Sequence, residues 1–382
     1  MPGPQPHDQP LLVHGLGREL VLPDWPPLTD EEVQAVLAQQ FGPDARSARV
    51  LWRSPRPLSA AGLVEVQQRA VFVKRHHARA RSVAQLAVEH ALSSHLRERE
   101  VAVPAVLGPA LELGGYVYEL HSQATGLDLY REDTSWSPFR SLGHARTAGA
   151  ALARFHRAAE DFPLPERPFG PLMGSAAIVR SPRPLGALAA LVEQRPTLAS
   201  ALRPYDWQQD FARHIAPAAE LAAAALAPLR PNWAHCDWHP TNLTWASDRP
   251  DADVAEVIDL GLANLTFAVH DLATAIERSA ISWLDLAEIG SATADLDALD
   301  ALLDGYETLR PLSPGEASAL ALVLPVVHVE YALSEVEYYA DIVGSRANAD
   351  LAYHAYLLGH ARWFEGPEGL ALLQHLEQRA RR

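Results

Sequence analysis

The residues with the clearest capacity for chemistry lie in one short loop and at one strand end. The run His-Cys-Asp-Trp-His-Pro-Thr-Asn places Asp237 and Asn242 five positions apart, and Asp259 closes the apolar run Val-Ile-Asp. Two carboxylates and an amide of this kind can orient an attacking hydroxyl group and ligate the magnesium ions that neutralise a triphosphate. The pattern therefore predicts transfer of a phosphoryl group.

A second signal is the lysine content. Lys74 is the only lysine in 382 residues, and every other strong cation is arginine. Lysine is a compact point charge whereas arginine is a wide planar fork, so the two are not equivalent at a buried phosphate site. Lys74 closes a short β-like run, 70–74, and this position favours a phosphate-binding role.

The composition excludes several classes of protein. A net charge of −15 argues against a nucleic-acid-binding surface, which needs clustered Lys and Arg. The single cysteine rules out an internal disulfide and fits a reducing compartment. The N-terminus has no apolar signal-peptide core, and the apolar stretch 221–226 is shorter than the roughly 20 residues that span a bilayer. We expect a soluble cytoplasmic protein without a membrane partner; the oligomeric state stays open.

The pattern of elements predicts an α+β chain with two lobes. Residues 1–45 read as a Pro-rich leader and one helix, 46–121 as a small β-rich lobe, and 122–382 as a larger α-helical lobe. The predicted strands are 49–52, 63–67, 70–75, 105–107 and 115–120, with a helix at 79–97. The predicted helices of the larger lobe are 147–159, 205–226, 267–284, 313–342 and 352–364, interrupted by a hairpin at 243–245 and 255–258. Pro217 and Pro325 should break or kink their helices.

The helix after Lys74 should bury a carboxylate. At 100° per residue, Glu89 lies at the centre of a face that also carries Leu86, Leu92 and Leu96. A buried carboxylate costs several kcal/mol unless it is paired, so we expect Lys74 to be its partner. The alternative is a helix whose rim reaches solvent at Glu89.

These residues resemble the aminoglycoside phosphotransferase and choline kinase family, which has a bilobal protein-kinase-like fold. The loop of that family usually reads His-Gly-Asp-x-His-x-x-Asn, and an Asp closes an apolar strand after it. The resemblance covers residues 48–282 through six ordered positions. The chain departs from the family pattern at Cys236, where the family usually has Gly. A thiol beside the base should make the enzyme sensitive to alkylation unless the cysteine is packed and inert.

The resemblance implies a role for each matched residue. Asp237 is similar to the catalytic base, and Asn242 and Asp259 to the Mg²⁺ ligands. Lys74 is similar to the lysine that holds the phosphates of ATP, and Glu89 to the residue that positions this lysine. The activity implied is a Mg-ATP-dependent phosphotransferase with an alcohol group as acceptor.

The remaining matched positions have supporting roles. Glu119 and His121 fall where the family offers main-chain groups to adenine. Asp271 matches a residue that braces the catalytic loop, and His235 matches a scaffold residue. His239 is either scaffold or part of the site.

A protein Ser/Thr kinase is the nearest alternative. Asp271 follows Asp259 by only twelve positions, which is too short for a phosphorylatable activation segment. Cys236 also stands where an arginine would read such a phosphate. Both observations favour a small-molecule acceptor.

Two alternatives come from other classes. His235, Asp237 and His239 alternate, so on a strand they would share a face and could bind the zinc of a hydrolase. That interpretation leaves Asn242 and Asp259 unexplained. A nucleotide-binding module without activity is the other alternative, although every residue needed for chemistry is present.

The acceptor is predicted only by class. Tyr331, Glu335 and Tyr338 share a helical face, and aromatic rings with a carboxylate suit an amine or quaternary ammonium group. The alternative is a solvated acidic face with tyrosines packed beneath it. An amino sugar, an amino alcohol, a homoserine-like compound and a sugar all stay open as acceptors.

Overall fold

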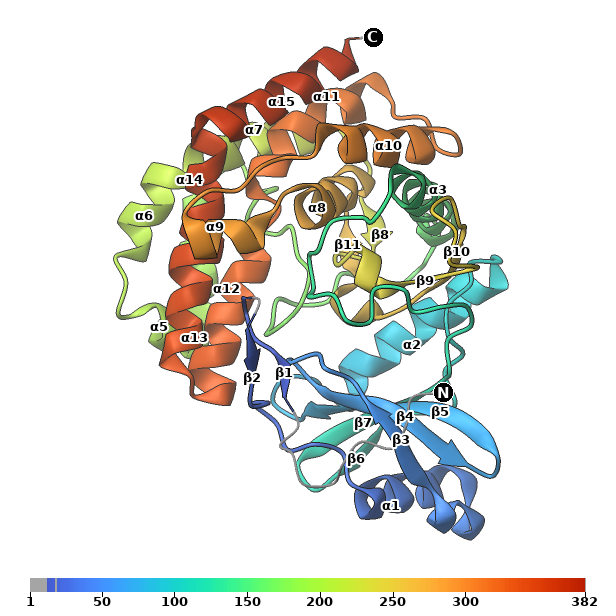
Figure 1. The fold of residues 1–382 in the computed structure, drawn as a ribbon. Helices are drawn as coiled ribbons and strands as arrows, with labels where there is room; N and C mark the ends of the chain where they lie inside the picture. The colour runs from blue at the N-terminus through green and yellow to red at the C-terminus, as the bar shows by residue number, and fades with distance from the viewer. Residues whose placement is uncertain (1–11, 18, 382) are drawn as a thin grey trace. The chain divides into compact units, whose positions relative to one another are not determined.

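The computed structural model describes residues 12–17 and 19–381, so residues 1–11 and 18 of the predicted leader lie outside the described residues. The chain divides into two compact units (Figure 1). The first comprises Met1–Ala87 and Ala105–Gln123, and the second comprises Val88–Pro104 and Ala124–Arg382. The first unit is built on a sheet and the second mainly of helices, as the α+β prediction requires. The division differs from the predicted boundaries because the N-terminal helix joins the first unit and residues 88–104 join the second.

The first unit is organised by a five-stranded antiparallel sheet with the order β3-β4-β5-β7-β6. Its strands are β3 (Arg49–Arg53), β4 (Ala60–Val66), β5 (Arg69–His77), β6 (Leu111–Leu113) and β7 (Tyr116–Ser122). The predicted strand at 105–107 is replaced by a single bridge between Val106 and His121, and β6 follows it. A separate pair, β1 (Val13–His14) and β2 (Leu20–Val21), precedes the sheet.

Helix α1 (Asp30–Phe41) packs on the sheet of the first unit. It begins with a capping box in which the Thr29 side chain accepts from the main chain of Glu32 and the Glu32 side chain accepts from Thr29. Val33 and Leu37 of the helix share a buried core with Val73 of β5. The helix therefore covers the face of β5 that carries Val73, and Lys74 lies on the opposite face because strand residues alternate.

The second unit contains the C-terminal part of α2 (Val83–Glu98) and most of the other helices. The others are α3 (Leu142–Ala159), α4 (Pro184–Gln194), α5 (Pro196–Leu202), α6 (Trp207–His214), α7 (Ala216–Leu226), α8 (Ala268–Ala280), α9 (Trp283–Ile289), α10 (Leu296–Glu307), α11 (Pro314–Val323), α12 (Val329–Glu337), α13 (Arg346–Leu351), α14 (His360–Glu365) and α15 (Pro367–Ala380). Four short strands, paired as two hairpin-like ladders, are β8 (Asn232–Ala234), β9 (Leu243–Trp245), β10 (Val254–Val257) and β11 (Asn264–Thr266).

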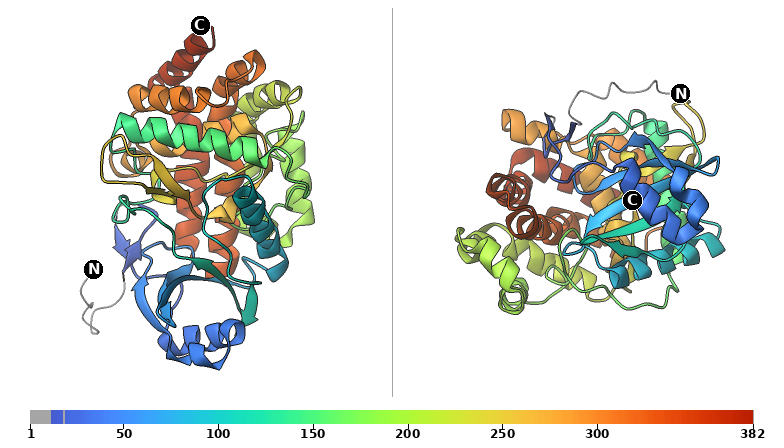
Figure 2. Two further views of the ribbon diagram at one scale, coloured as in Figure 1. Left: turned by 90° about the vertical axis from the view of Figure 1, so that its right-hand side faces the viewer. Right: turned by 90° about the horizontal axis from the view of Figure 1, so that it is seen from below.

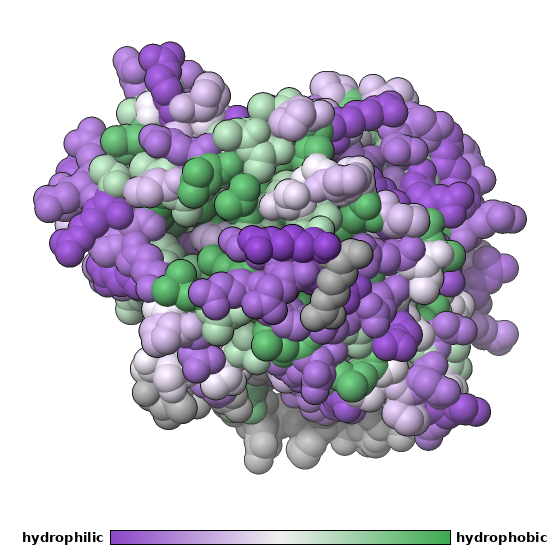
Figure 3. Space-filling model, turned by 90° about the horizontal axis from the view of Figure 1, so that it is seen from above, coloured by the Kyte–Doolittle hydropathy of each residue, from purple (hydrophilic) through white to green (hydrophobic). Residues whose placement is uncertain are grey.

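The prolines interrupt the helices at the predicted places. Pro217 lies in the first turn of α7, directly after α6 ends, and Pro325 lies in a short 3-10 turn between α11 and α12. From Pro314 to Val343 the helical segments form a run long and apolar enough to cross a membrane, but most of it is buried inside the protein, as in a core helix. This run is longer than the stretch 221–226 that the composition singled out. On the surface seen in Figure 3, hydrophilic residues surround smaller groups of hydrophobic ones.

Helices α3 and α10 lie side by side (Figures 1 and 2). Two glycines make this close approach possible. A Cβ atom at Gly149 would lie 1.9 Å from the main-chain oxygen of Leu302, and one at Gly305 would lie 1.8 Å from that of Arg146. His156 of α3 contacts Tyr306 of α10 and Asp271 of α8, so the packing of α10 against α3 supports the position of Asp271.

Candidate active site

The loop after β8 carries the expected base. The carboxylate of Asp237 accepts a 2.9 Å hydrogen bond from Nδ2 of Asn242, and the same nitrogen lies 2.9 Å from the main-chain oxygen of Asp237. A 3-10 turn over Pro240–Asn242 brings Asn242 back to Asp237. Two residues that the sequence assigned to one site are thus in direct contact.

Asp271 of α8 braces this loop. Its Oδ2 accepts a hydrogen bond of 2.8 Å from the main-chain N–H of His235, and its Oδ1 accepts one of 2.8 Å from that of Cys236. Burial acts to raise the pKa of Asp271, but the hydrogen bond and charge of His156 outweigh it and hold the pKa below its usual range. An ionised, fully buried carboxylate therefore fixes the loop, in agreement with the structural role expected for Asp271.

The hairpin of β9 and β10 brings Asp259 to the same place. Leu243 pairs with Val257, and the next residue, Ile258, donates a 3.0 Å hydrogen bond to the main-chain oxygen of Asn242. Asp259 follows with a φ of +59°, and its Oδ1 accepts from the Gly261 N–H at 3.2 Å. Left-handed backbone of this kind is costly for a residue with a Cβ atom and concentrates at functional sites.

Asn242 and Asp259 form a donor set that fits magnesium. Nδ2 of Asn242 donates its hydrogen bond to Asp237, so the oxygen on the other side of the same side-chain amide points away from Asp237. Mg²⁺ prefers carboxylate and amide oxygens. These two residues would hold the ion, which when bound neutralises negative charge on the phosphates.

Two other side chains contact Asp237. Nε2 of His239 lies 3.2 Å from Oδ1 of Asp237 and 3.2 Å from Nδ2 of Asn242, so His239 lines the site. Arg278 of α8 forms an ion pair with Asp237 and its side chain is only 4% exposed. Arg278 is not among the residues expected from the sequence, although it follows Asp271 by seven positions and therefore lies two turns further along the same helix face.

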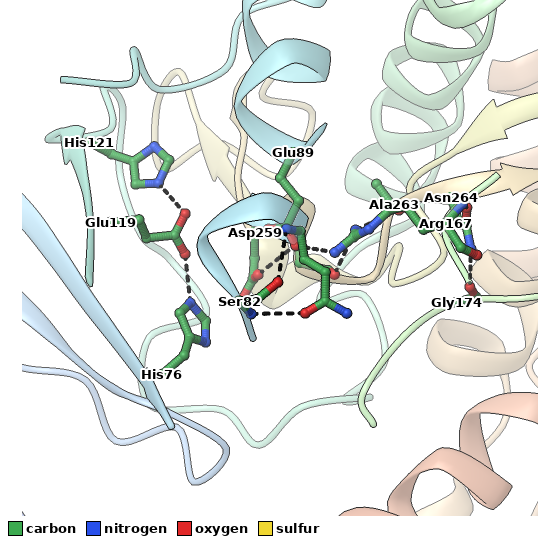
Figure 4. A network of polar contacts seen from close by, with 12 residues as sticks. His76, Ser82, Glu89, Glu119, His121, Arg167, Gly174, Asp259, Ala263 and Asn264 are labelled. Carbon is green, nitrogen blue, oxygen red and sulfur yellow. Dashed lines mark hydrogen bonds and ion pairs between the residues drawn. The ribbon is translucent and has the colours of Figure 1, made fainter. Parts of the chain in front are cut away.

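In the first unit, the unique lysine faces a carboxylate across the sheet. Lys74 of β5 pairs in register with Glu119 of β7, so their side chains point to the same face, opposite the one covered by α1. Glu119 is buried, and His76 and His121 hold its two oxygens at 2.8 and 2.9 Å (Figure 4). Burial is the main reason why the pKa of His76 is lowered, and the charge of Lys74 lowers it further.

The main chain of Glu119 and His121 belongs to the sheet. Leu120 accepts from Leu107 and Ser122 donates to Ala105, both at 2.8 Å, so these alternate residues direct their main-chain groups away from β5. Glu119 and His121 must direct theirs towards β5, with which they pair. Main-chain groups that pair with β5 are not available to adenine, so this arrangement does not support the expectation that Glu119 and His121 bind adenine through the main chain. Their side chains instead bond to each other on the face of the sheet that carries Lys74.

Glu89 is buried, as the helical pattern predicted. Its partner within the second unit is Arg167, whose Nη2 forms an ion pair with Oε1 of Glu89 (Figure 4). Nη1 of Arg167 donates to the main-chain oxygens of Gly261 at 3.2 Å and Ala263 at 2.8 Å. Arg167 thus ties α2 to the segment that directly follows Asp259. The pairing of Glu89 with Lys74 stays a prediction.

Cys236 occupies a position that normally suits glycine. Its φ is +61°, in the left-handed region where a Cβ atom is unfavourable. The side chain is buried against Ala234 and Leu262, and burial raises the pKa of the thiol. The thiolate needed for alkylation is therefore scarce, and we expect Cys236 to be packed and slow to react.

The comparison with known proteins agrees with this geometry. A model of the phosphotransferase enzyme family matches residues 61–312, which include the sheet strands β5 and β7 and the whole Asp237 loop. The chain belongs to the phosphotransferase enzyme family.

The individual relatives are distant. A homoserine kinase of Phenylobacterium zucineum (strain HLK1) is 27% identical over 192 residues, covering 48% of this chain and 48% of the relative, so the chain spans about half the length of the curated relative it matches. A spectinomycin phosphotransferase with bound ADP and spectinomycin has a TM-score of 0.52 at 11% identity, covering 89% of this chain and 99% of the other. The GDP complex of aminoglycoside 2'-phosphotransferase-IIIa has a TM-score of 0.53 at 13% identity, covering 86% and 99%. These likenesses confirm the protein-kinase-like fold.

Proposed function

We propose that this chain is a small-molecule kinase that transfers the γ-phosphoryl group of Mg-ATP to a hydroxyl group. The observation that carries the proposal is the contact of Asp237 with Asn242, together with the hairpin that adds Asp259. A candidate base and the two oxygen ligands expected for magnesium thus come together within one compact unit.

The residues present suit the steps of that reaction. Asp237 would accept the hydrogen bond of the acceptor hydroxyl and then its proton, an assistance typically worth about 10²–10⁴ in rate. Lys74, on the face of the first sheet opposite α1, would bind phosphate oxygens as a point charge. Asp271 keeps the loop in place by two hydrogen bonds, so Asp237 needs no rearrangement before the acceptor arrives.

The structure disfavours a protein kinase. Between Asp259 and α8, the chain forms a 3-10 turn at Leu260–Leu262 and strand β11 at Asn264–Thr266. Only Ala263 and Phe267 of this segment lie outside these elements, which is too few residues for an activation loop. A small-molecule acceptor is the better proposal.

The structure also disfavours zinc hydrolysis. Nε2 of His235 lies 3.1 Å from the main-chain oxygen of Ile258, and Nδ1 accepts from the main-chain N–H of Asp237 at 3.2 Å. Both ring nitrogens are therefore engaged, and among the described residues His235, Asp237 and His239 do not form a metal-binding group.

The relatives narrow the choice of phosphate donor and of acceptor. Complexes of the two structural neighbours hold ADP in one case and GDP in the other, so either nucleoside triphosphate is a candidate donor, with ATP as our first choice. The acceptors named for the relatives include homoserine and spectinomycin. A cytoplasmic location and the absence of nucleic-acid partners stay predictions from the sequence.

A direct test is phosphate transfer from γ-labelled ATP or GTP, with magnesium, to a panel of hydroxylated amino acids, amino alcohols, sugars and aminoglycosides. We expect label on at least one acceptor, and none when magnesium is removed by a chelator. Full nucleotide binding without transfer to any acceptor would favour a binding module without activity. Tightly bound zinc together with no effect of nucleotide on melting would favour the hydrolase.

A further inference from the structure

Arg278 lies at the centre of a buried group of side chains in the second unit, next to Asp237. We call this group the Arg278 cluster, and its members are Trp136, Asp237, Glu277, Arg278, Tyr331 and Glu335. The guanidinium carbon of Arg278 lies 4.6 Å from the centre of the Tyr331 ring and 5.2 Å from that of Trp136. The two rings also contact each other edge-on, and a guanidinium in contact with both is held in a fixed orientation.

The cluster does not suit an acceptor whose only charge is positive. The sequence pattern favours a cation site at Tyr331 and Glu335, but the ring of Tyr331 already stacks against the cation of Arg278. A second cation at this place would be repelled by the guanidinium. Burial also raises the pKa of Glu335 to about 8, so at neutral pH its carboxyl is a weak anion for an amine.

The alternative of a solvated acidic face is wrong. Glu335 is 3% exposed and Tyr338 is fully buried. The helix face of α12 therefore points into the protein, and its polar groups require an explanation other than contact with water.

The hydrogen-bonding capacity of Arg278 is only partly used. Among the described residues, its Nε has no hydrogen-bond partner, and the nearest oxygen of Glu277 is 3.9 Å away, beyond hydrogen-bond length. Arg278 forms a close ion pair with Asp237. A buried guanidinium with unused N–H groups is costly unless an anion completes it.

Trp136 adds an independent observation. Its φ is +64°, an unfavourable conformation for a bulky residue, and the ring packs edge-on against Tyr331, Tyr356 and His360. This strain places the indole against the guanidinium. Strained backbone at such a point indicates a functional demand on the position of the ring.

We propose that the acceptor carries a carboxylate beside its hydroxyl group, and that Arg278 binds this carboxylate while Asp237 binds the hydroxyl. The inference rests on the proposed function and narrows its acceptor to hydroxy acids and hydroxylated amino acids. A planar fork of N–H donors matches a carboxylate in a way that a sugar hydroxyl does not. When the acceptor oxygen bonds to the γ-phosphorus, the bond from that phosphorus to the bridging oxygen of ADP breaks and the hydroxyl proton passes to Asp237.

The first experiment uses the unaltered protein and four acceptors that differ in charge. They are 2-amino-4-hydroxybutanoate, its primary amide, 4-hydroxybutanoate and 3-amino-1-propanol, with choline and kanamycin as cationic acceptors without a carboxylate. Phosphate transfer from Mg-ATP is measured as kcat and KM. We expect the two carboxylates to be used and the amide to have a KM roughly 10- to 100-fold higher than its parent, the loss expected for one charged hydrogen-bonded contact.

The second experiment alters the protein. In R278Q, the KM for the carboxylate acceptor should rise by a similar factor, and by at least tenfold more than the KM for 3-amino-1-propanol, because loss of the ion pair with Asp237 affects both acceptors. R278K keeps the positive charge but not the planar fork of N–H donors, so its KM for the carboxylate acceptor should lie between those of the parent protein and R278Q. The exposed Arg203→Gln serves as the matched control and should behave as the parent protein.

The outcomes distinguish failure of the carboxylate inference from failure of the proposed kinase function. Better turnover of choline, kanamycin or 3-amino-1-propanol than of either carboxylate would overturn the inference and leave the proposed function intact. Equal KM values for the acid and its amide would also overturn it, even if R278Q fails to fold. Transfer to none of the compounds tested here or in the wider panel would overturn the proposed function itself.

Discussion

Lys74 and Glu119 face each other on neighbouring strands of the first sheet, on the face that α1 leaves uncovered. Directly opposed residues of an antiparallel pair have Cβ atoms about 4.5–5.5 Å apart, within reach of a lysine and a glutamate side chain. His76 and His121 fix the carboxylate of Glu119. The only ammonium group of the side chains therefore has an anionic neighbour within its own sheet, independent of Glu89.

We expect Glu119→Gln to disturb nucleotide use. The amide removes the negative charge opposite Lys74. If that charge positions the lysine, the KM for ATP should rise about tenfold, which corresponds to about 1.4 kcal/mol, with a smaller effect on the acceptor KM. Steady-state kinetics with each substrate varied in turn measure this split. Glu112→Gln, at an exposed position of β6, is the control. Unchanged ATP kinetics in E119Q would show that Glu119 has no role in positioning the lysine.

Arg167→Met should destabilise the protein. The change leaves Glu89 buried without its partner, which typically costs about 3–5 kcal/mol. Thermal unfolding of the variant should therefore begin at a clearly lower temperature, whereas Arg180→Gln, which breaks a partly exposed pair with Glu166, should shift it little. The double variant E89Q/R167M should recover part of the loss. An equal loss in the single and double variants would contradict the pairing.

The contact of α3 with α10 predicts a contrast between two glycines. Gly149→Ala places a methyl group against the main chain of α10 and should cost about 1–3 kcal/mol or more. Gly186→Ala in α4 meets nothing closer than 3.7 Å and should be neutral or stabilise the helix by about 0.5–1 kcal/mol. Denaturant unfolding of the two variants measures the difference. Similar stabilities would contradict the close helix packing.

Glu335→Gln should change how stability depends on pH. The folded pKa of Glu335 is raised to about 8, above the ordinary value of 4.5, because the group is buried. Between pH 4.5 and 8 the unfolded chain has released a proton that the folded protein keeps, so stability falls as pH rises, by at most about 1.4 kcal/mol per unit. The amide cannot ionise, so the melting temperature of E335Q relative to the parent should rise from pH 5 to pH 8. A constant difference across that range would contradict a protonated Glu335.

Local chemistry explains which parts of the fold were predictable. The breaks at Pro217 and Pro325 and the hairpin beside Asp259 depend on neighbours in the chain, so the sequence contains their causes. Helices α10 and α15 were missed, as was the exchange of the strand at 105–107 for β6. The hydrophobic patterns of these segments are weak, and their secondary structure depends on how they pack against the rest of the protein.

The same distinction applies to the site. Asp237, Asn242 and Asp259 belong to one loop and one hairpin, so their spacing predicted that they would meet. The partner of Glu89 did not follow from spacing, because Arg167 lies 78 positions away in an irregular segment. Arg278 had a faint signal in its distance of seven residues from Asp271, but nothing in the sequence showed that this helix face turns towards Asp237.

The central claim is that Asp237 acts in transfer and not in binding of the nucleotide, and one variant tests it most directly. Asp237→Asn preserves the shape of the side chain, so the affinity for ATP should stay within about twofold while the rate of transfer to the best acceptor falls by about 10² or more. Asp248→Asn, at an exposed position of the hairpin turn, is the matched control and should keep the parent rate. Transfer by D237N at the rate of the parent protein would contradict the account.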